Sequence, residues 1–401
     1  MKNIPFKEAV RISIVNLLKE LIKFTYFLIW LLFDPRKFTK INVKNVKNVL
    51  VICGGAIGDI YNILGVINAV IKKYPVNIHI LTLEKNRKFV KNPLIDSINL
   101  ENAKKLIDKK IIDSAVLIDP SREKEIFDKE MFFKLFKVPY VVSSDSFKLN
   151  FSSVKKQSFP ISATRKMYPV GANGPQTFLR LFGFLKLKID KPLFYFTDAG
   201  KEFSNQFFKE NLKKSERVIV IHPSSPRIIK ALDEGKPPAH LWPIENWARL
   251  IDEIAKDKNI KMIMTGIKSE SPLLNKIYNL VEDKSRIVYS VGKIPDLESL
   301  ASVVRKAIAT VTLDTSMAHI TSQVETPAVI IYGATSPKRV RPIGTKNIDI
   351  YHKDKSHECK KYACKFCHNI HMKSITVDEV YSALKSLVET NKSNQLKDEV
   401  Y

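Results

Sequence analysis

The sequence predicts an α/β protein with two successive Rossmann-like domains, each an open parallel sheet covered by helices, behind an apolar N-terminal helix. Short apolar runs that end in glycine or small polar residues alternate with segments whose apolar residues recur at helical spacing. This alternation occurs twice, on either side of an aromatic, basic and loop-rich stretch at about residues 150–215. The chain has 401 residues, of which 45% are hydrophobic, enough for two or three domain cores.

The N-terminal stretch 10–33 is apolar, but Lys19, Glu20 and Lys23 interrupt it. The uncharged run 24–33 is shorter than the roughly 20 apolar residues that a spanning helix needs. Asp34-Pro35 ends the helix where a secretory signal would carry a cleavage site, and a basic cluster follows. We expect residues 1–40 to form an amphipathic helix in the membrane interface. The alternative is packing on the protein's own core or on a partner subunit.

The first α/β series begins with the apolar run 48–53, which Gly54-Gly55 bounds and which reads as a buried parallel strand. Apolar side chains at helical spacing then predict a helix over 59–73, which Tyr74-Pro75 ends. Three further short apolar runs are expected as strands, at 77–83, 115–118 and 140–142.

The second series predicts strands at 217–222, 261–265, 286–289, 309–313 and 328–332. Helices are expected at 244–256, 272–281, 296–306, 317–323 and 377–389. We therefore divide the chain into the N-terminal helix (1–40), a first Rossmann-like domain (41–205) and a second Rossmann-like domain (206–395). Ligands of such sheets bind beyond the carboxyl ends of the strands, so we expect the site between the two domains.

The formal net charge is +25, which indicates an anionic partner. Residues 1–200 hold 34 basic and 17 acidic side chains, whereas residues 201–401 hold 32 and 24, so the first half carries the larger surplus. Many of these lysines are equally well explained as solvated surface charge. Four cysteines and 13 glycines exclude a disulfide scaffold and a collagen-like repeat.

The first loop, Cys53 to Asp59, joins a strand to a helix and is rich in glycine, as anion-binding loops are. A dinucleotide fingerprint would require a glycine at position 53, so an oxidoreductase is not favoured. Asp59 stands at the start of the helix. A carboxylate there is either a helix cap or, at the edge of a cleft, a general base.

The second half presents further loops of small hydroxyl residues, glycine and one carboxylate at strand ends. Such loops can hold a nucleoside diphosphate, because amides and hydroxyls bind phosphate and a carboxylate binds a ribose diol. His319 is either a core histidine or part of this site. The candidate residues for this nucleoside-diphosphate site are Ser224, Glu270, Asp314, Thr315, Ser316, Met317, His319, Gly333 and Thr335.

The order and spacing of these motifs from Val46 to Leu387 resemble glycosyltransferase family 9, the heptosyltransferases of lipopolysaccharide core assembly. The matching motifs are Ile57-Gly58-Asp59, Trp242-Pro243, Gly266…Glu270, Asp314-Thr315…His319 and Gly333-Ala334-Thr335…Pro337. The resemblance implies two facing domains of the GT-B type, with 41–205 as the acceptor domain and 206–395 as the donor domain. It also implies an inverting transfer that requires no metal or other cofactor. It implies that Asp59 is the general base and that Glu270 holds the ribose. Thr315, Ser316 and Met317 would bind the donor diphosphate.

Two positions depart from the family pattern. His240 stands near the place of a phosphate-binding lysine before Trp242-Pro243, and the loop from Lys230 to Pro238 is longer. Ser316 replaces the glycine of an Asp-Thr-Gly pattern. The candidates for phosphate contacts are then Lys236, His240 and Arg339.

The C-terminal region holds a cluster of cysteines and histidines. The spacing C-x4-C-x2-C with a following histidine could bind zinc, but reduced structural cysteines explain it as well, and we expect no metal. The set that would bind zinc is Cys359, Cys364, Cys367 and His371.

The expected function is transfer of a heptose or similar sugar from a nucleotide-diphosphate sugar, ADP-heptose first, to a lipopolysaccharide core or related glycolipid. Such an acceptor is anionic, and Arg165, Lys166 and Arg180 are candidates for its surface. We expect a cytoplasmic protein, peripheral on the inner face of the cytoplasmic membrane. The alternative is a non-catalytic protein that binds sugar nucleotide or lipopolysaccharide and keeps the fold. No nucleic-acid-binding motif accompanies the charge, so nucleic acid is not an expected partner.

Overall fold

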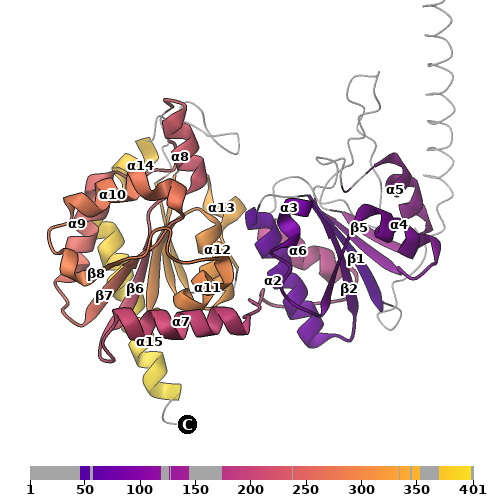
Figure 1. Cartoon of the computed structure of the whole chain (residues 1–401), viewed down its shortest axis with the longest axis horizontal. Helices are drawn as coiled ribbons and strands as arrows, with labels where there is room; N and C mark the ends of the chain where they lie inside the picture. Colours follow the sequence, from indigo (N-terminus) through magenta and orange to yellow (C-terminus); the bar gives the residue numbers. More distant parts are fainter. Residues whose placement is uncertain are drawn as a thin grey trace, which may run out of the picture.

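The computed structural model contains two parallel sheets, each in its own layered unit, lying side by side (Figure 1). The predicted membrane helix (1–40), Arg165 and Lys166, and the three clustered cysteines all lie outside the residues that the structure describes. Among the described residues, no helix is both long and apolar enough to cross a membrane. The structure describes residues 46–54, 57–118, 126, 128–143, 174–236, 238–333, 335–343, 346–352 and 370–398.

The first sheet has the strand order β3-β2-β1-β4-β5, with every neighbouring pair parallel. Alternate side chains of β1 enter two cores: Val49 and Val51 pack with α2 and α6, whereas Leu50 and Ile52 pack with α4 and α5. The strands are β1 (Asn48–Cys53), β2 (Asn77–Thr82), β3 (Ile95–Ile98), β4 (Ser114–Ile118) and β5 (Tyr140–Ser143). The helices are α2 (Ile57–Lys73), α3 (Glu84–Arg87), α4 (Leu100–Asp108), α5 (Lys129–Lys134) and α6 (Gly174–Phe184).

The second sheet has the strand order β11-β10-β9-β6-β7-β8, again parallel throughout. Helices α9, α10 and α15 cover one face, and α7, α11 and α12 cover the other. The strands are β6 (Arg217–His222), β7 (Ile260–Met264), β8 (Ile287–Tyr289), β9 (Ala309–Leu313), β10 (Ala328–Tyr332) and β11 (Asn347–Tyr351). The helices are α7 (Asp198–Asn211), α8 (Pro226–Asp233), α9 (Ile244–Ala255), α10 (Ser271–Leu280), α11 (Leu297–Arg305), α12 (Ser316–Gln323), α13 (Pro337–Val340), α14 (Ile370–Ser374) and α15 (Val377–Asp398).

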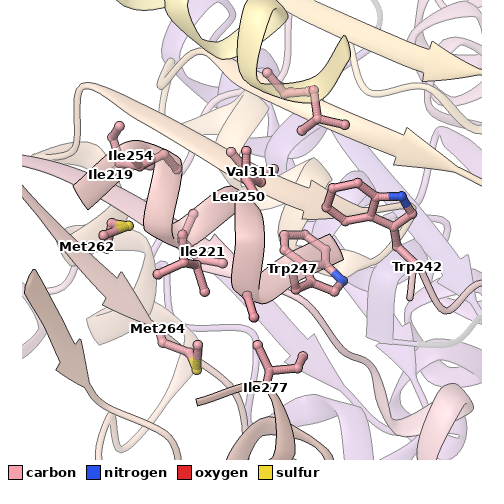
Figure 2. Packing of buried hydrophobic residues seen from close by; sticks show 14 of the residues in the cluster. Ile219, Ile221, Trp242, Trp247, Leu250, Ile254, Met262, Met264, Ile277 and Val311 are labelled. Carbon is pink, nitrogen blue, oxygen red and sulfur yellow. The ribbon is translucent and has the colours of Figure 1, made fainter. Parts of the chain in front are cut away.

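Two fully buried tryptophans join the start of α9 to the C-terminal part of the chain. The rings of Trp242 and Trp247 meet edge to face, 5.1 Å between centroids, beside Ile221 and Leu250 (Figure 2). The Trp242 indole N–H donates to the Ile375 carbonyl oxygen at 3.0 Å. The segment between α14 and α15 is thereby fixed to the loop that precedes α9.

The predicted strands agree closely with the structure, but the loop-rich stretch does not. Helices α6 and α7 lie within residues 150–215, and α8 occupies part of the expected loop from Lys230 to Pro238. In α6, Gly174 and Pro175 stand at the start of the helix, where proline is tolerated because its missing N–H has no helical partner. Strands β3 and β11, one at the edge of each sheet, were not expected. Helix α7 crosses position 205, where we placed the domain division, and packs on the second sheet.

Candidate active site

An open cleft of about 610 Å³ lies between the two domains. Loops that follow β6, β7 and β9 of the second sheet form most of its wall, and residues after α3 of the first domain close the other side. In each sheet the strand order reverses at one point, between β1 and β4 in the first sheet and between β6 and β9 in the second. The cleft is therefore at the position where open parallel sheets bind ligands.

Helices α2 and α12 run side by side across the domain boundary, with their N-termini together. A Cβ atom on Gly58 would lie 3.5 Å from the Ser316 hydroxyl, and one on Gly65, two turns later, would strike Gln323. The Gln323 side-chain amide donates to the Tyr61 carbonyl oxygen at 3.0 Å. Two helix N-termini therefore meet at the cleft, and their dipoles favour negative charge there.

Asp59 lies half-buried in the first turn of α2, directly after Gly58. It is not among the residues that line the cleft, but its neighbour Gly58 lies against Ser316, which does. The two groups that the resemblance assigns to acceptor and donor thus stand at adjoining helix ends.

The loop after β9 brings four of the predicted donor residues into the cleft: Asp314, Thr315, Ser316 and Met317. Thr315 caps α12, because its hydroxyl accepts from the Met317 N–H at 3.2 Å. Burial raises the pKa of the Asp314 carboxyl to about 6. Ser316, where the family pattern has glycine, faces the first turn of α2.

Glu270 lines the cleft although its side chain is buried. One carboxylate oxygen, Oε2, accepts from the Ile267 N–H at 2.7 Å. The other, Oε1, is buried and has no hydrogen-bond partner within the described part of the protein. Leaving a buried acceptor without a hydrogen-bond partner costs free energy, so this oxygen is suited to accept hydrogen bonds from the hydroxyl groups of a ligand.

His240 and Thr335 connect three loops around Asp314. The Thr335 hydroxyl lies 3.4 Å from His240 Nδ1. Thr335 also lowers the pKa of the Asp314 carboxyl, against the larger effect of burial. Burial lowers the pKa of His240 to about 4, so its imidazole is neutral at pH 7 and does not supply a phosphate-binding cation. Gly333 packs against the backbone that precedes His240: a Cβ atom on Gly333 would come within 2.4 Å of the Ala239 carbonyl oxygen.

Four of the nine predicted donor residues do not line the cleft: Gly333 and Thr335, and also Ser224 and His319. Ser224 is fully buried, and the next residue, Ser225, lines the cleft instead. Burial lowers the pKa of His319 to about 4, and its Nδ1 has no partner among the described residues. Ser316 and Gln323 lie on the face of α12 that contacts α2. His319 falls on the same face, because it is spaced three and four residues from them.

The predicted basic contacts are also outside the cleft. Lys236 is exposed and pairs with Glu234 at 2.5 Å. Arg180 is exposed on α6, and the Arg339 side chain is outside the described part of the structure. His371, from the predicted metal set, is buried and its Nδ1 lies 2.8 Å from the His352 carbonyl oxygen. The described residues include no group of three or more histidine, cysteine or acidic side chains that could hold a metal ion.

Several cleft residues were missed in the sequence. Lys88 and Lys91 reach it from the first domain, and Arg227 reaches it from the start of α8. His222, at the end of β6, donates from Nδ1 to the Thr265 carbonyl oxygen, 3.1 Å away, and burial lowers its pKa. The signal for His222 was its place at a strand end, whereas Lys88 and Lys91 follow α3 and Arg227 lies within α8, where the strand pattern gave no signal.

A buried contact between the domains adjoins the cleft. The Tyr61 hydroxyl of α2 donates to Glu298 Oε1 of α11 at 3.3 Å. Burial raises the pKa of both groups, so the carboxyl of Glu298 is harder to ionise than in water.

Fold and sequence together define the class of this protein. The two facing parallel-sheet domains have the GT-B architecture of glycosyltransferases. Residues 185–369 match the model of glycosyltransferase family 9 (heptosyltransferase). This part of the chain thus matches the family that the motifs indicated, and the match supports a glycosyltransferase. No curated protein sequence matches the chain.

Solved structures with the same fold cover nearly all of the chain. A family 9 glycosyltransferase from Veillonella parvula has 15% identity and a TM-score of 0.64, covering 88% of this chain and 99% of its own. The E. coli ADP-heptose lipopolysaccharide heptosyltransferase II has 17% identity and a TM-score of 0.58, covering 86% and 99%. The E. coli heptosyltransferase WaaC, solved with ADP, has 14% identity and a TM-score of 0.54, covering 85% and 99%. At these identities the similarity shows the fold.

Proposed function

We propose that this glycosyltransferase moves a heptose or similar sugar, with inversion, from a nucleotide-diphosphate sugar to a lipopolysaccharide core or related glycolipid. The observation that carries the proposal is the meeting of α2 and α12 at the cleft. The N-terminus of α2 carries a carboxylate, Asp59. The N-terminus of α12 presents its backbone amides beside Ser316. A base and an anion site on opposite domains suit a transfer between two substrates.

In the proposed reaction the Asp59 carboxylate takes the proton of an acceptor hydroxyl. The hydroxyl oxygen forms a bond to the anomeric carbon of the donor sugar, while the bond from that carbon to the diphosphate oxygen breaks on the opposite face. The leaving nucleoside diphosphate gains negative charge. Backbone amides at the start of α12, around Thr315 and Ser316, would stabilise this charge without rearranging.

ADP-heptose is the proposed donor. Of the E. coli proteins with the same fold, one is named an ADP-heptose lipopolysaccharide heptosyltransferase and the other was solved with ADP. In this chain, the free oxygen of Glu270 would accept hydrogen bonds from the ribose hydroxyls. Apolar side chains on the same side of the cleft, Ile267, Ile294 and Leu297, would contact the base.

The proposed acceptor is an anionic glycolipid at the cytoplasmic face of the membrane. Lys88 and Lys91, on the first-domain side of the cleft, support an acidic acceptor. We extend this surface to Arg165, Lys166 and Arg180, and assign membrane contact to residues 1–40. The full chain should float with anionic vesicles, and a form lacking residues 1–40 should lose flotation. Retained flotation of the shortened form would refute the role of that segment.

Binding of nucleotide sugars tests the donor assignment. We expect ADP-heptose to raise the melting temperature more than GDP-, UDP- or CDP-sugars, because ligands that bind only the folded state stabilise it. A stronger response to another nucleotide would change the donor. No response to any of them would refute a working donor site. Binding without turnover, when an acceptor is present, would favour a non-catalytic protein.

A further inference from the structure

Arg227 lies at a position that neither the family motifs nor the comparisons assign. Ser225 caps α8, its hydroxyl accepting from the Ile228 N–H at 3.3 Å, and Pro226 opens the helix. The cap and the proline fix the direction of the first turn, from which Arg227 enters the cleft.

The other basic side chains near this wall already have partners. Lys230 and Lys236 both pair with Glu234, and Arg341 pairs with Asp349 at 3.2 Å. Arg227 makes no hydrogen bond or ion pair with any residue that the structure describes, and it is exposed to the cleft. Its guanidinium is thus available to a ligand.

Charge in the cleft favours a cation at this place. Four carboxylates line it, and among the described lining residues of the second domain Arg227 is the one permanent cation. It lowers the pKa of both His240 and Asp314, so its charge lies near both groups and near the start of α12. A diphosphate beside Asp314 requires such a charge to offset the carboxylate.

We propose that Arg227 binds the donor diphosphate in place of the family's lysine, near whose position His240 stands. The inference rests on the proposed function. A guanidinium can hold two phosphate oxygens at once, so Arg227 would add affinity for a diphosphate and little for a nucleoside. His240, joined to Thr335, would position the surrounding loop.

The test compares the affinities of ADP and adenosine by calorimetry. Arg227→Ala should weaken ADP binding at least about tenfold and leave adenosine binding unchanged, since a charge-assisted contact is lost. Arg227→Lys should keep part of the ADP affinity. Lys236→Ala is the matched control, a nearby exposed cation paired with Glu234, and should bind ADP as the wild type does.

Three results would overturn the inference. If Arg227→Ala bound ADP as tightly as the wild type, Arg227 would not contact the diphosphate. If it lost ADP and adenosine affinity equally, the residue would act on the fold of the site instead. If wild-type protein bound no ADP at all, the proposed donor itself would be wrong, and the assignment of Arg227 with it. The first two results would overturn the assignment of Arg227 alone.

Discussion

Single residues at this site behave according to their burial more than their type. His240 and His319 are both neutral at pH 7 because burial lowers each pKa to about 4. The pKa of Asp314 moves in the opposite direction for the same reason, since burial penalises the charged form. An exposed histidine, with a pKa of about 6.5, would still be partly protonated at pH 7, whereas these two are not.

Asp314 should make the stability of the protein depend on pH. Its pKa of about 6 in the folded state exceeds the ordinary value of 3.8, so the folded protein binds the proton more tightly. Stability is lost as pH rises from about 4 through 6, at a cost of about 3 kcal/mol above that range. Asp314→Asn should therefore melt higher than the wild type at pH 7.5, measured by calorimetry.

The same variant at pH 4 provides the control. The wild-type carboxyl is then protonated in the folded state, and the two proteins should melt at similar temperatures. If Asp314→Asn raised the melting temperature equally at both pH values, the stabilisation would not come from the titration of Asp314.

At the residue scale the sequence located the cleft-lining part of the second domain well. Asp314, Thr315, Ser316, Met317 and Glu270 all line the cleft because each follows a strand of a parallel sheet, and strand ends share an edge. Ser224 shows the limit: neighbouring side chains at a strand exit point in opposite directions, and Ser225 is the one that faces the cleft.

Elements were predicted where apolar periodicity was strong. Helix α2 and the central strands agree with their predicted ranges to within a few residues. Helix α8 was missed because Gly235 and the prolines near it suggested a loop, although a helix ends just before them. Arg227 was missed with it, since a residue expected in a loop has no predictable direction.

The contact of α2 with α12 depends on Gly65. A Cβ atom there would come within 2.5 Å of the Gln323 side chain and 2.9 Å of Pro192 Cβ. Gln323 is buried and holds the Tyr61 carbonyl, so it cannot easily move away. We expect Gly65→Ala to lower the free energy of unfolding by about 1–3 kcal/mol, measured by urea denaturation.

Gly183 in α6 is the matched control. Beyond its chain neighbours and the backbone of its own helix, no atom lies within 4 Å of the position that its Cβ would take. Gly183→Ala should stabilise the protein by about 0.5–1 kcal/mol, because alanine favours the helix and restricts the unfolded chain. Equal effects of the two substitutions would refute the tight contact between α2 and α12.

The whole molecule brings together groups that are far apart in the chain. Gly58 of the first domain lies against Ser316 of the second. The Tyr61 hydroxyl of the first domain donates a hydrogen bond to Glu298 of the second. The sequence could predict two parallel-sheet domains and a cleft between them, since that follows from chain order. It could not predict which helices meet, because that depends on side-chain fit between domains.

Part of the positive charge of the first domain lines the cleft. Lys88 and Lys91 stand across the cleft from Arg227, so anionic groups of two substrates could be held on opposite walls. The surplus of basic residues in the first half of the chain is thus consistent with an acidic acceptor.

Acceptor-dependent release of ADP from ADP-heptose, compared between the wild type and Asp59→Asn, is the most direct measurement. Asparagine keeps the shape of the side chain but cannot take the acceptor's proton. We predict that the variant binds ADP as the wild type does and releases it about a thousandfold more slowly when a lipopolysaccharide core acceptor is present. Equal release rates in the two proteins would contradict Asp59 as the base and the two-helix site built around it.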